Sequence, residues 1–201
     1  MMKLDIEHIS FWMDAIRNSS DKDRTLESFW KGQLRSKVWL IDNLKPFISS
    51  SVSIDIFGGW NGVLASLLFQ SEIDIVKIRS IDIDPACENT ANTMNKIEEM
   101  QGRFMSITED MCGSISSAEV IINTSCEHIS QCQYDQWLSN INDKSLIVVQ
   151  SNNYEITEHI RIAKSLEEFE NQSNIRVIWS GELDLPLYTR FMIIGKKKCL
   201  D

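Results

Sequence analysis

The sequence has 201 residues, of which 43% are hydrophobic and 24% are charged, a balance typical of one globular domain and unlike that of a disordered chain. Its 20 basic and 29 acidic residues give a net charge of −9, which argues against a duplex nucleic acid as partner because phosphate binding requires a basic surface. No apolar run approaches the roughly 20 residues that span a bilayer, and the charged amino-terminal segment is unlike a signal peptide. We therefore expect a cytoplasmic protein that binds a small molecule, with neither duplex nucleic acid nor membrane as partner and an oligomeric state that composition leaves open.

The first fifty residues have the apolar spacing of helices. A short helix is predicted over residues 6–17, and a longer one over residues 25–44, which Pro46 ends. The polar stretch between them predicts a turn. We interpret residues 1–50 as a helical extension and residues 51–201 as the main domain.

From residue 51 the pattern changes to short β-branched runs that alternate with segments of helical period. Strands are predicted at 52–57, 76–83, 103–107, 118–125 and 145–151, and helices at 63–70, 86–100, 134–141 and 156–170. Such alternation predicts parallel strands joined by right-handed crossovers. Two last runs, 175–183 and 188–197, predict an antiparallel hairpin. The expected fold is therefore α/β, a three-layer sandwich around a seven-stranded, mostly parallel sheet with an antiparallel last strand.

The loops after the first two predicted strands have the features of a nucleotide site. Ligands of open α/β sheets bind beyond the carboxyl ends of the strands. The first strand carries Asp55 and runs into FGGWNG, a loop whose glycines permit close backbone approach to a ligand. The second strand reaches Asp82, 23 residues after Gly59, the spacing at which an acidic side chain meets ribose hydroxyls. Asp84, before Pro85, is interpreted as the cap of the next helix.

The later strands bring further polar side chains to the same edge of the sheet. The third strand is followed by Glu109 and Asp110, and the fourth by Asn123, Ser125, Cys126, Glu127 and His128. The fifth strand and the hairpin add Gln150, Asn152, Asn153, Tyr154, Tyr188 and Arg190. This edge is more polar than a sheet end requires, which favours a ligand site there.

This succession resembles the class I, Rossmann-like S-adenosylmethionine-dependent methyltransferases over about residues 52–197. In that family the glycine loop lies against the methionine part of the cofactor, and acidic residues after strands two and three meet the ribose and the adenine. The resemblance implies S-adenosylmethionine as cofactor, bound by Asp55, Phe57, Gly58, Gly59, Trp60, Asp82, Ile83, Asp110, Met111 and Asn123. Two departures stand out: Phe57 replaces the first glycine of the family's loop, and the Asn-Pro-Pro-Tyr signature of base-modifying enzymes matches only at Asn123.

The resemblance also implies methyl transfer to a small molecule, in which the protein aligns the reactants and removes a proton where the acceptor carries one. His128 is the candidate base, Glu127 orients it or binds a cationic substrate, and Asn123 contacts the acceptor. The amino-terminal extension would act as a lid over the site. The candidate substrate contacts are Trp30, Lys37, Gln150, Asn152, Asn153, Tyr154, Tyr188 and Arg190.

Other functions are compatible with parts of this pattern. A domain that binds S-adenosylmethionine without catalysis, a partner subunit, or an enzyme that cleaves the cofactor or transfers another of its groups would share the cofactor loops. An NAD-binding oxidoreductase is a further alternative, although Asp55 stands where that class has an apolar residue near a pyrophosphate. The spacing of Cys126, His128, Cys132 and His159 matches no common zinc pattern, so no metal is predicted.

Overall fold

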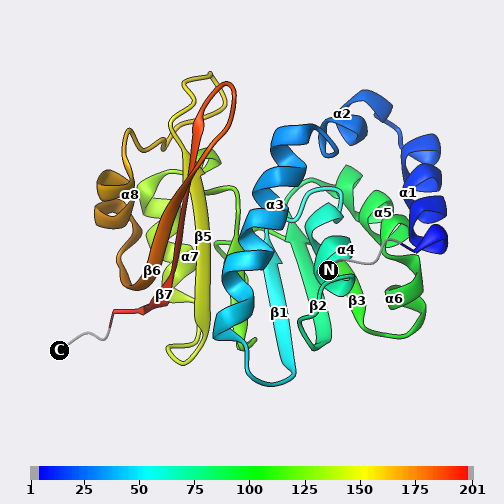
Figure 1. Ribbon diagram of the computed structural model, residues 1–201, viewed down its shortest axis with the longest axis horizontal. Helices are drawn as coiled ribbons and strands as arrows, with labels where there is room; N and C mark the ends of the chain where they lie inside the picture. The colour runs from blue at the N-terminus through cyan, green and yellow to red at the C-terminus, as the bar shows by residue number, and fades with distance from the viewer. Residues whose placement is uncertain (1–4, 199–201) are drawn as a thin grey trace.

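The computed structural model describes residues 5–198 as a seven-stranded sheet with helices on both faces (Figure 1). The strands are β1 (Val52–Phe57), β2 (Ile75–Asp82), β3 (Phe104–Thr108), β4 (Val120–Asn123), β5 (Leu146–Asn152), β6 (Ile175–Asp184) and β7 (Thr189–Lys197). The helices are α1 (Ile6–Asn18), α2 (Lys22–Glu27), α3 (Lys31–Leu44), α4 (Val63–Phe69), α5 (Pro85–Met94), α6 (Lys96–Met100), α7 (Gln131–Ser139) and α8 (Leu166–Ser173). Short 3₁₀ turns lie at Lys45–Phe47 and Cys126–His128.

The strand order is β3-β2-β1-β4-β5-β7-β6. Strands β1 to β5 pair in parallel, whereas β7 runs antiparallel to both β5 and β6. The predicted seven-stranded sheet with an antiparallel last strand is therefore confirmed. Its central strands are buried on both faces, which is why they appear in the sequence as continuous apolar runs.

Alternating side chains divide the sheet between two cores. On one face Ile54 and Ile56 pack with helices α3, α4 and α5, and on the other face Phe57 packs with α7 and α8. Leu40 and Leu44 of α3 are completely buried in the first core. Figure 1 shows α3 crossing in front of the sheet, so the amino-terminal extension shares its core with the main domain.

Two of the predicted helices are each divided in the structure. The helix expected over 25–44 is two helices, because Asp21 caps α2 and a turn at residues 28–30 precedes α3. The helix expected over 86–100 divides at Asn95, whose side chain donates to the Gly62 and Ala91 carbonyls at 3.1 and 2.9 Å.

None of the helices within residues 5–198 combines the length and apolar character needed to cross a membrane.

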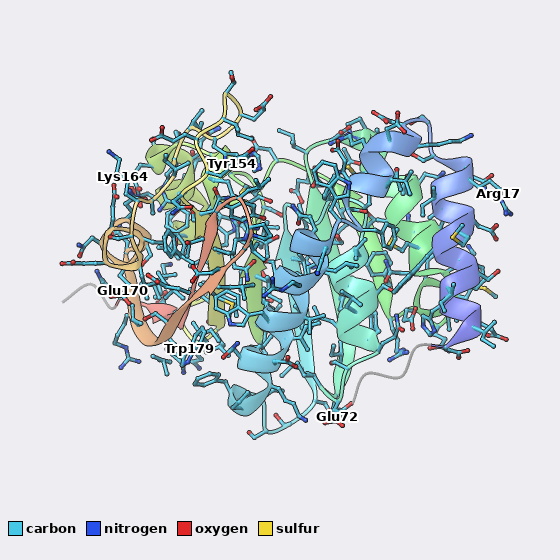
Figure 2. All side chains as sticks on the ribbon, turned by 45° about the horizontal axis from the view of Figure 1, so that its top comes forward. Arg17, Glu72, Tyr154, Lys164, Glu170 and Trp179 are labelled. Carbon is cyan, nitrogen blue, oxygen red and sulfur yellow. The ribbon has the colours of Figure 1, made fainter. Side chains whose placement is uncertain are left out.

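The helix predicted over 156–170 is mostly wrong. Residues 156–165 form turns, and α8 begins only after Ser165, whose hydroxyl accepts the Glu168 N–H at 3.2 Å. Apolar spacing alone had suggested the longer helix. The irregular segment instead lies at the carboxyl end of the sheet, where Tyr154 is labelled in Figure 2.

Candidate functional site

A cavity of about 690 Å³ lies at the carboxyl ends of β1, β2 and β4 and is bounded above the sheet by residues of α2 and α3. This volume is within the range of roughly 300–1,000 Å³ found for small-molecule sites. A shallower depression of about 430 Å³ along α8, lined by residues such as Ser165 and Glu168, lies away from the strand ends. We therefore place the candidate site in the larger cavity.

One end of the cavity is built by the glycine loop after β1. Gly58 has φ of 65°, and an added Cβ there would lie 2.3 Å from the Ser125 hydroxyl oxygen. At Gly59 an added Cβ would lie 1.9 Å from the Ser80 hydroxyl oxygen. Trp60 also has positive φ, 49°, an uncommon conformation for a residue with a side chain. Gly58 and Gly59 therefore lie too close to Ser125, which follows β4, and to Ser80 of β2 for any larger residue. Trp60, the next residue of the loop, lines the cavity.

Asp82 ends β2 beside this loop and holds it in place. One carboxylate oxygen accepts the Trp60 N–H at 2.8 Å, and the other accepts the Asp84 N–H at 3.0 Å. Asp84 caps α5 as predicted, by accepting the Ala86 N–H at 2.9 Å, and it forms an ion pair with Arg24 of α2. The hydrogen bond from Ala86 and the pairing with Arg24 hold the pKa of Asp84 below its usual value. Asp82 still lines the cavity, so its remaining lone pairs can accept from a ligand.

The other end of the cavity contains a buried ion pair between Glu127 and Arg190, 2.5 Å apart. The same oxygen of Glu127 accepts from the Asn152 amide at 2.6 Å. The Arg190 guanidinium also donates to the Thr124 carbonyl at 2.9 Å and to Gln150 at 3.4 Å. Gln150 and Asn152 are almost completely buried, so they position the ion pair and do not line the cavity themselves.

Lys37 of α3 reaches into the cavity next to this ion pair. Its ammonium group donates to Gln33 at 2.9 Å, and both side chains line the cavity. Burial, together with repulsion from Arg190, lowers the pKa of Lys37 from 10.5 to about 7. Near neutral pH this amine is therefore partly uncharged, and it can either accept a proton or pair with an anion.

Strand alternation explains why some predicted cofactor residues are elsewhere. Ile56 lines the cavity, whereas the neighbouring Asp55 points to the opposite face of the sheet. There its carboxylate accepts from the Arg79 guanidinium at 2.8 Å and from the Ser116 hydroxyl. Phe57 points to the same opposite face and is fully buried. Neither Asp55 nor Phe57, both predicted to contact the cofactor, is a lining residue of this cavity.

Asn123 and Asp110 also lie outside the cavity lining. Asn123 is fully buried at the end of β4, where it accepts the Ser125 N–H at 2.9 Å and its amide lies 3.6 Å from the Met111 sulfur. Asp110 accepts the Cys112 N–H at 2.9 Å. Met111 itself lines the cavity, as do Gly58, Gly59, Trp60, Asp82 and Ile83 among the predicted cofactor residues.

The predicted substrate residues divide in the same way. Lys37 and Arg190 line the cavity together with the predicted catalytic residues Glu127 and His128. Tyr154, labelled in Figure 2, stacks on Tyr188 with ring centroids 5.6 Å apart, and its centroid lies 6.1 Å from that of His159, which lines the cavity. Two predicted contacts have other positions: the Trp30 side chain is 65% exposed outside the cavity lining, and the Asn153 side chain accepts the Thr189 N–H at 2.8 Å.

The cavity also contains residues that the sequence did not suggest as ligand contacts. Arg24 and Glu27 come from α2, in a stretch predicted to be a turn followed by the start of a longer helix. Ile156, Glu158 and His159 come from the segment that was predicted to be helical. In the sequence His159 enters only a cysteine-containing set of possible metal ligands. No spacing rule would have connected these two segments to the strand ends.

Comparisons with known proteins agree with this architecture. Neither protein-family models nor curated proteins give a match to the sequence. Among solved structures, magnesium protoporphyrin IX methyltransferase from Synechocystis PCC 6803 with bound SAM aligns over 94% of this chain and 91% of its own, with a TM-score of 0.66 and 10% identity. The N-methyltransferase NodS from Bradyrhizobium japonicum WM9, in complex with S-adenosyl-L-homocysteine, aligns over 93% and 98%, with a TM-score of 0.65 and 9% identity.

A third structure, the pyocyanin biosynthetic protein PhzM, aligns over 93% of this chain and 62% of its own, with a TM-score of 0.64 and 14% identity. This chain has the fold of the class I, Rossmann-like methyltransferases. At such low identity the likeness concerns the fold alone. In a class I fold the ligand site lies beyond the carboxyl ends of the strands, which is where the cavity is found.

Proposed function

We propose that this protein is an S-adenosylmethionine-dependent methyltransferase that acts on a small molecule. The observation that carries the proposal is one cavity at the carboxyl ends of the strands with two unlike ends. One end is a glycine loop beside an acidic residue, and the other combines the buried Glu127–Arg190 ion pair with the imidazoles of His128 and His159. The first end suits a nucleoside with a cationic tail, and the second suits a polar acceptor.

The residues at the loop end fit S-adenosylmethionine. Gly58 and Gly59, which have no side chains, present backbone to the cavity, Trp60 lines it beside them, and Asp82 offers carboxylate lone pairs at the position where the ribose hydroxyls would lie. The exposed Ile83 next to Asp82 and the Met111 side chain supply apolar surface for the adenine. When bound, the cofactor supplies a methyl group on a positively charged sulfur, which leaves as a neutral thioether.

The residues at the other end would orient the acceptor and receive its proton. His128 lines the cavity and is exposed, so its imidazole can reach an acceptor in the cavity. Glu127 and Arg190 neutralise each other, and Lys37 adds a partly charged amine. We propose that the acceptor has a nucleophilic hydroxyl or amine that is placed beside His128.

The size of the acceptor is limited by α2 and α3. Arg24 and Glu27 of α2 and Gln33 and Lys37 of α3 line the cavity opposite the sheet, which supports their role as a lid. The ion pair between Arg24 and Asp84 joins this lid to the amino-terminal end of α5. A site covered in this way favours a small molecule over a polynucleotide, in agreement with the net charge of −9.

Binding and turnover test this proposal separately. Calorimetric titration should show binding of S-adenosylmethionine and S-adenosylhomocysteine, whereas tight binding of NAD with neither of these would indicate an oxidoreductase. Turnover is tested with methyl-labelled cofactor against metabolite, tRNA, DNA and protein fractions, with the products identified by mass spectrometry. Label in the metabolite fraction supports the proposal, label only in a macromolecular fraction contradicts the small-molecule acceptor, and cofactor breakdown without methyl transfer indicates another reaction.

A further inference from the structure

Three side chains capable of binding metal meet at the end of the cavity opposite the glycine loop, where Glu127 and Arg190 lie and which we call the acceptor end. Within residues 5–198, one group of three His, Cys, Asp or Glu side chains has its ligand atoms all within 4.8 Å of one another: Glu127, His128 and His159. The chain has only three histidines, so two of its three imidazoles lie here, beside a buried carboxylate. All three side chains line the cavity. Two imidazoles and one carboxylate form a donor set that suits zinc and related divalent ions.

The Glu127 carboxylate has one oxygen to spare. Arg190 and Asn152 both donate to Oε1, whereas Oε2 is buried and has no hydrogen-bond partner. The residue is only 3% exposed. A buried carboxylate oxygen without a partner is unfavourable, and a bound cation would supply the partner. The bonds from Arg190 and Asn152 are of the kind that holds a metal-ligating carboxylate in place.

Both histidines are also held in the way that metal-ligating histidines usually are. Nδ1 of His128 lies 3.1 Å from the Glu158 carbonyl oxygen, and Nδ1 of His159 lies 2.7 Å from the Tyr154 carbonyl oxygen. Because a carbonyl oxygen only accepts, each Nδ1 must donate, which leaves the Nε2 lone pair free in the neutral ring. An outer bond from the second ring nitrogen to a carbonyl is the usual support of a ligating imidazole.

The segment that carries His159 is fixed against Glu127. The Ile160 and Arg161 N–H groups donate to the Glu127 carbonyl at 2.9 and 3.1 Å. The Arg161 guanidinium lies over the Tyr134 ring, 4.0 Å from its centroid, and donates to Gln131 at 2.7 Å. The cluster is therefore held by backbone bonds and a buried arginine, as a preorganised ligand site requires.

We propose that Glu127, His128 and His159 bind a first-row divalent transition-metal ion, such as Zn²⁺, at the acceptor end of the cavity. Three protein ligands leave a coordination position for the acceptor. Zinc–ligand distances of about 2 Å require the three donor atoms, which lie within 4.8 Å of one another, to approach slightly. The cysteines considered from the sequence do not take part: Cys126 is fully buried with its sulfur 3.7 Å from the Asn123 carbonyl oxygen, and Cys132 is exposed on α7.

The role of the ion rests on the proposed function. An ion bound to Glu127, His128 and His159 would coordinate the hydroxyl or amine of the acceptor and lower its pKa, so that its proton is released to water in the cavity. It would then replace His128 as the group that activates the acceptor, because the imidazole lone pair would be used in coordination. Binding of the ion itself does not depend on methyl transfer and can be measured alone.

The test is a titration of chelator-treated protein with Co²⁺ in the absence of S-adenosylmethionine, followed by calorimetry and visible absorption. We expect one ion per chain, with ligand-field bands and without the charge-transfer band of a cysteine thiolate. His159→Asn and His128→Asn should each weaken Co²⁺ binding by roughly 100-fold, because removing a metal ligand costs at least as much affinity as removing a group that hydrogen-bonds to a ligand. The matched control is His8→Asn: His8 pairs with Glu98 at 3.1 Å, outside the cavity lining, and its substitution should leave Co²⁺ binding unchanged.

The proposal is overturned if the wild-type protein binds no Co²⁺, or if both His159→Asn and His128→Asn bind it as the wild type does. A thiolate charge-transfer band would likewise place the ion elsewhere. Circular dichroism of each variant checks that it is folded. Neither His128 nor His159 belongs to the buried Glu127–Arg190 ion pair, so neither substitution removes that pair. S-adenosylmethionine is titrated in parallel: Co²⁺ binding without cofactor binding overturns the proposed function alone, and the reverse result overturns the metal site alone.

Discussion

Replacing Lys37 by Met should stabilise the protein near neutral pH. In the folded state the pKa of Lys37 is about 7, compared with 10.5 for an ordinary lysine, because of burial and the nearby Arg190. A lysine with a lowered pKa makes the folded state progressively less stable as the pH falls through the range in which only the unfolded chain binds the proton. Its cost is absent above pH 10.5, grows as the pH falls towards 7, and is constant below.

The magnitude follows from this pKa difference. At about 1.4 kcal/mol for a pKa difference of one, the cost at pH 7 is at most about 4 kcal/mol, and it falls by about half at pH 9. Water in the cavity reduces it, so we expect Lys37→Met to gain at least about 1 kcal/mol at pH 7, or roughly 2–4 °C in Tm.

The assay is urea unfolding of the wild type and Lys37→Met between pH 6 and 9, with Lys31→Met as the control. Lys31 is exposed at the start of the same helix, so its substitution should leave the free energy of unfolding unchanged. Comparing the difference between variant and wild type at each pH cancels the titration of all other groups. An advantage of Lys37→Met that is the same at pH 6 and pH 9, or no advantage at all, would refute the reasoning.

Three further predictions test the two ends of the cavity. Asp82→Ala should weaken S-adenosylmethionine binding in calorimetry by about 1.5–3 kcal/mol, whereas the exposed Asp42→Ala should not, and equal affinities would exclude Asp82 as a contact. Gly59→Ala should destabilise the fold by about 1–3 kcal/mol in urea, because its Cβ would meet the Ser80 hydroxyl, and Ser80→Ala should restore a measurable part. Arg190→Met should cost about 3–5 kcal/mol by leaving Glu127 buried and unpaired, and adding Glu127→Gln should recover part of it; strict additivity of the two would contradict the ion pair.

The sheet and the glycine loop could be predicted because their determinants are local. A buried parallel strand appears as a β-branched run, and Asp84 before Pro85 marks the start of a helix wherever the chain then goes. The sequence could not show which face a strand side chain occupies when both faces are buried. Asp55 was therefore assigned to the ligand, although the structure pairs it with Arg79 on the other face.

The segment 156–165 differs from the predicted helix for another reason. Its apolar residues recur at helical spacing, but two of its N–H groups bond to the Glu127 carbonyl and its Arg161 is buried over Tyr134. These tertiary bonds replace the helical ones, and helical propensity is too weak to oppose them. The same bonds bring His159 next to His128, a pairing that no distance along the sequence suggests.

The two ends of the cavity thus differ in how they are encoded. The loop end is assembled from β1, β2 and the turns that directly follow them, so its residues lie close together in the sequence as well as in space. The acceptor end combines Lys37, Glu127, His159 and Arg190, which come from four separate elements and meet only through tertiary packing. Function lies in such sites and not in the fold that carries them. The acceptor must therefore be deduced from the chemistry of these four side chains, and the likeness to other class I structures cannot supply it.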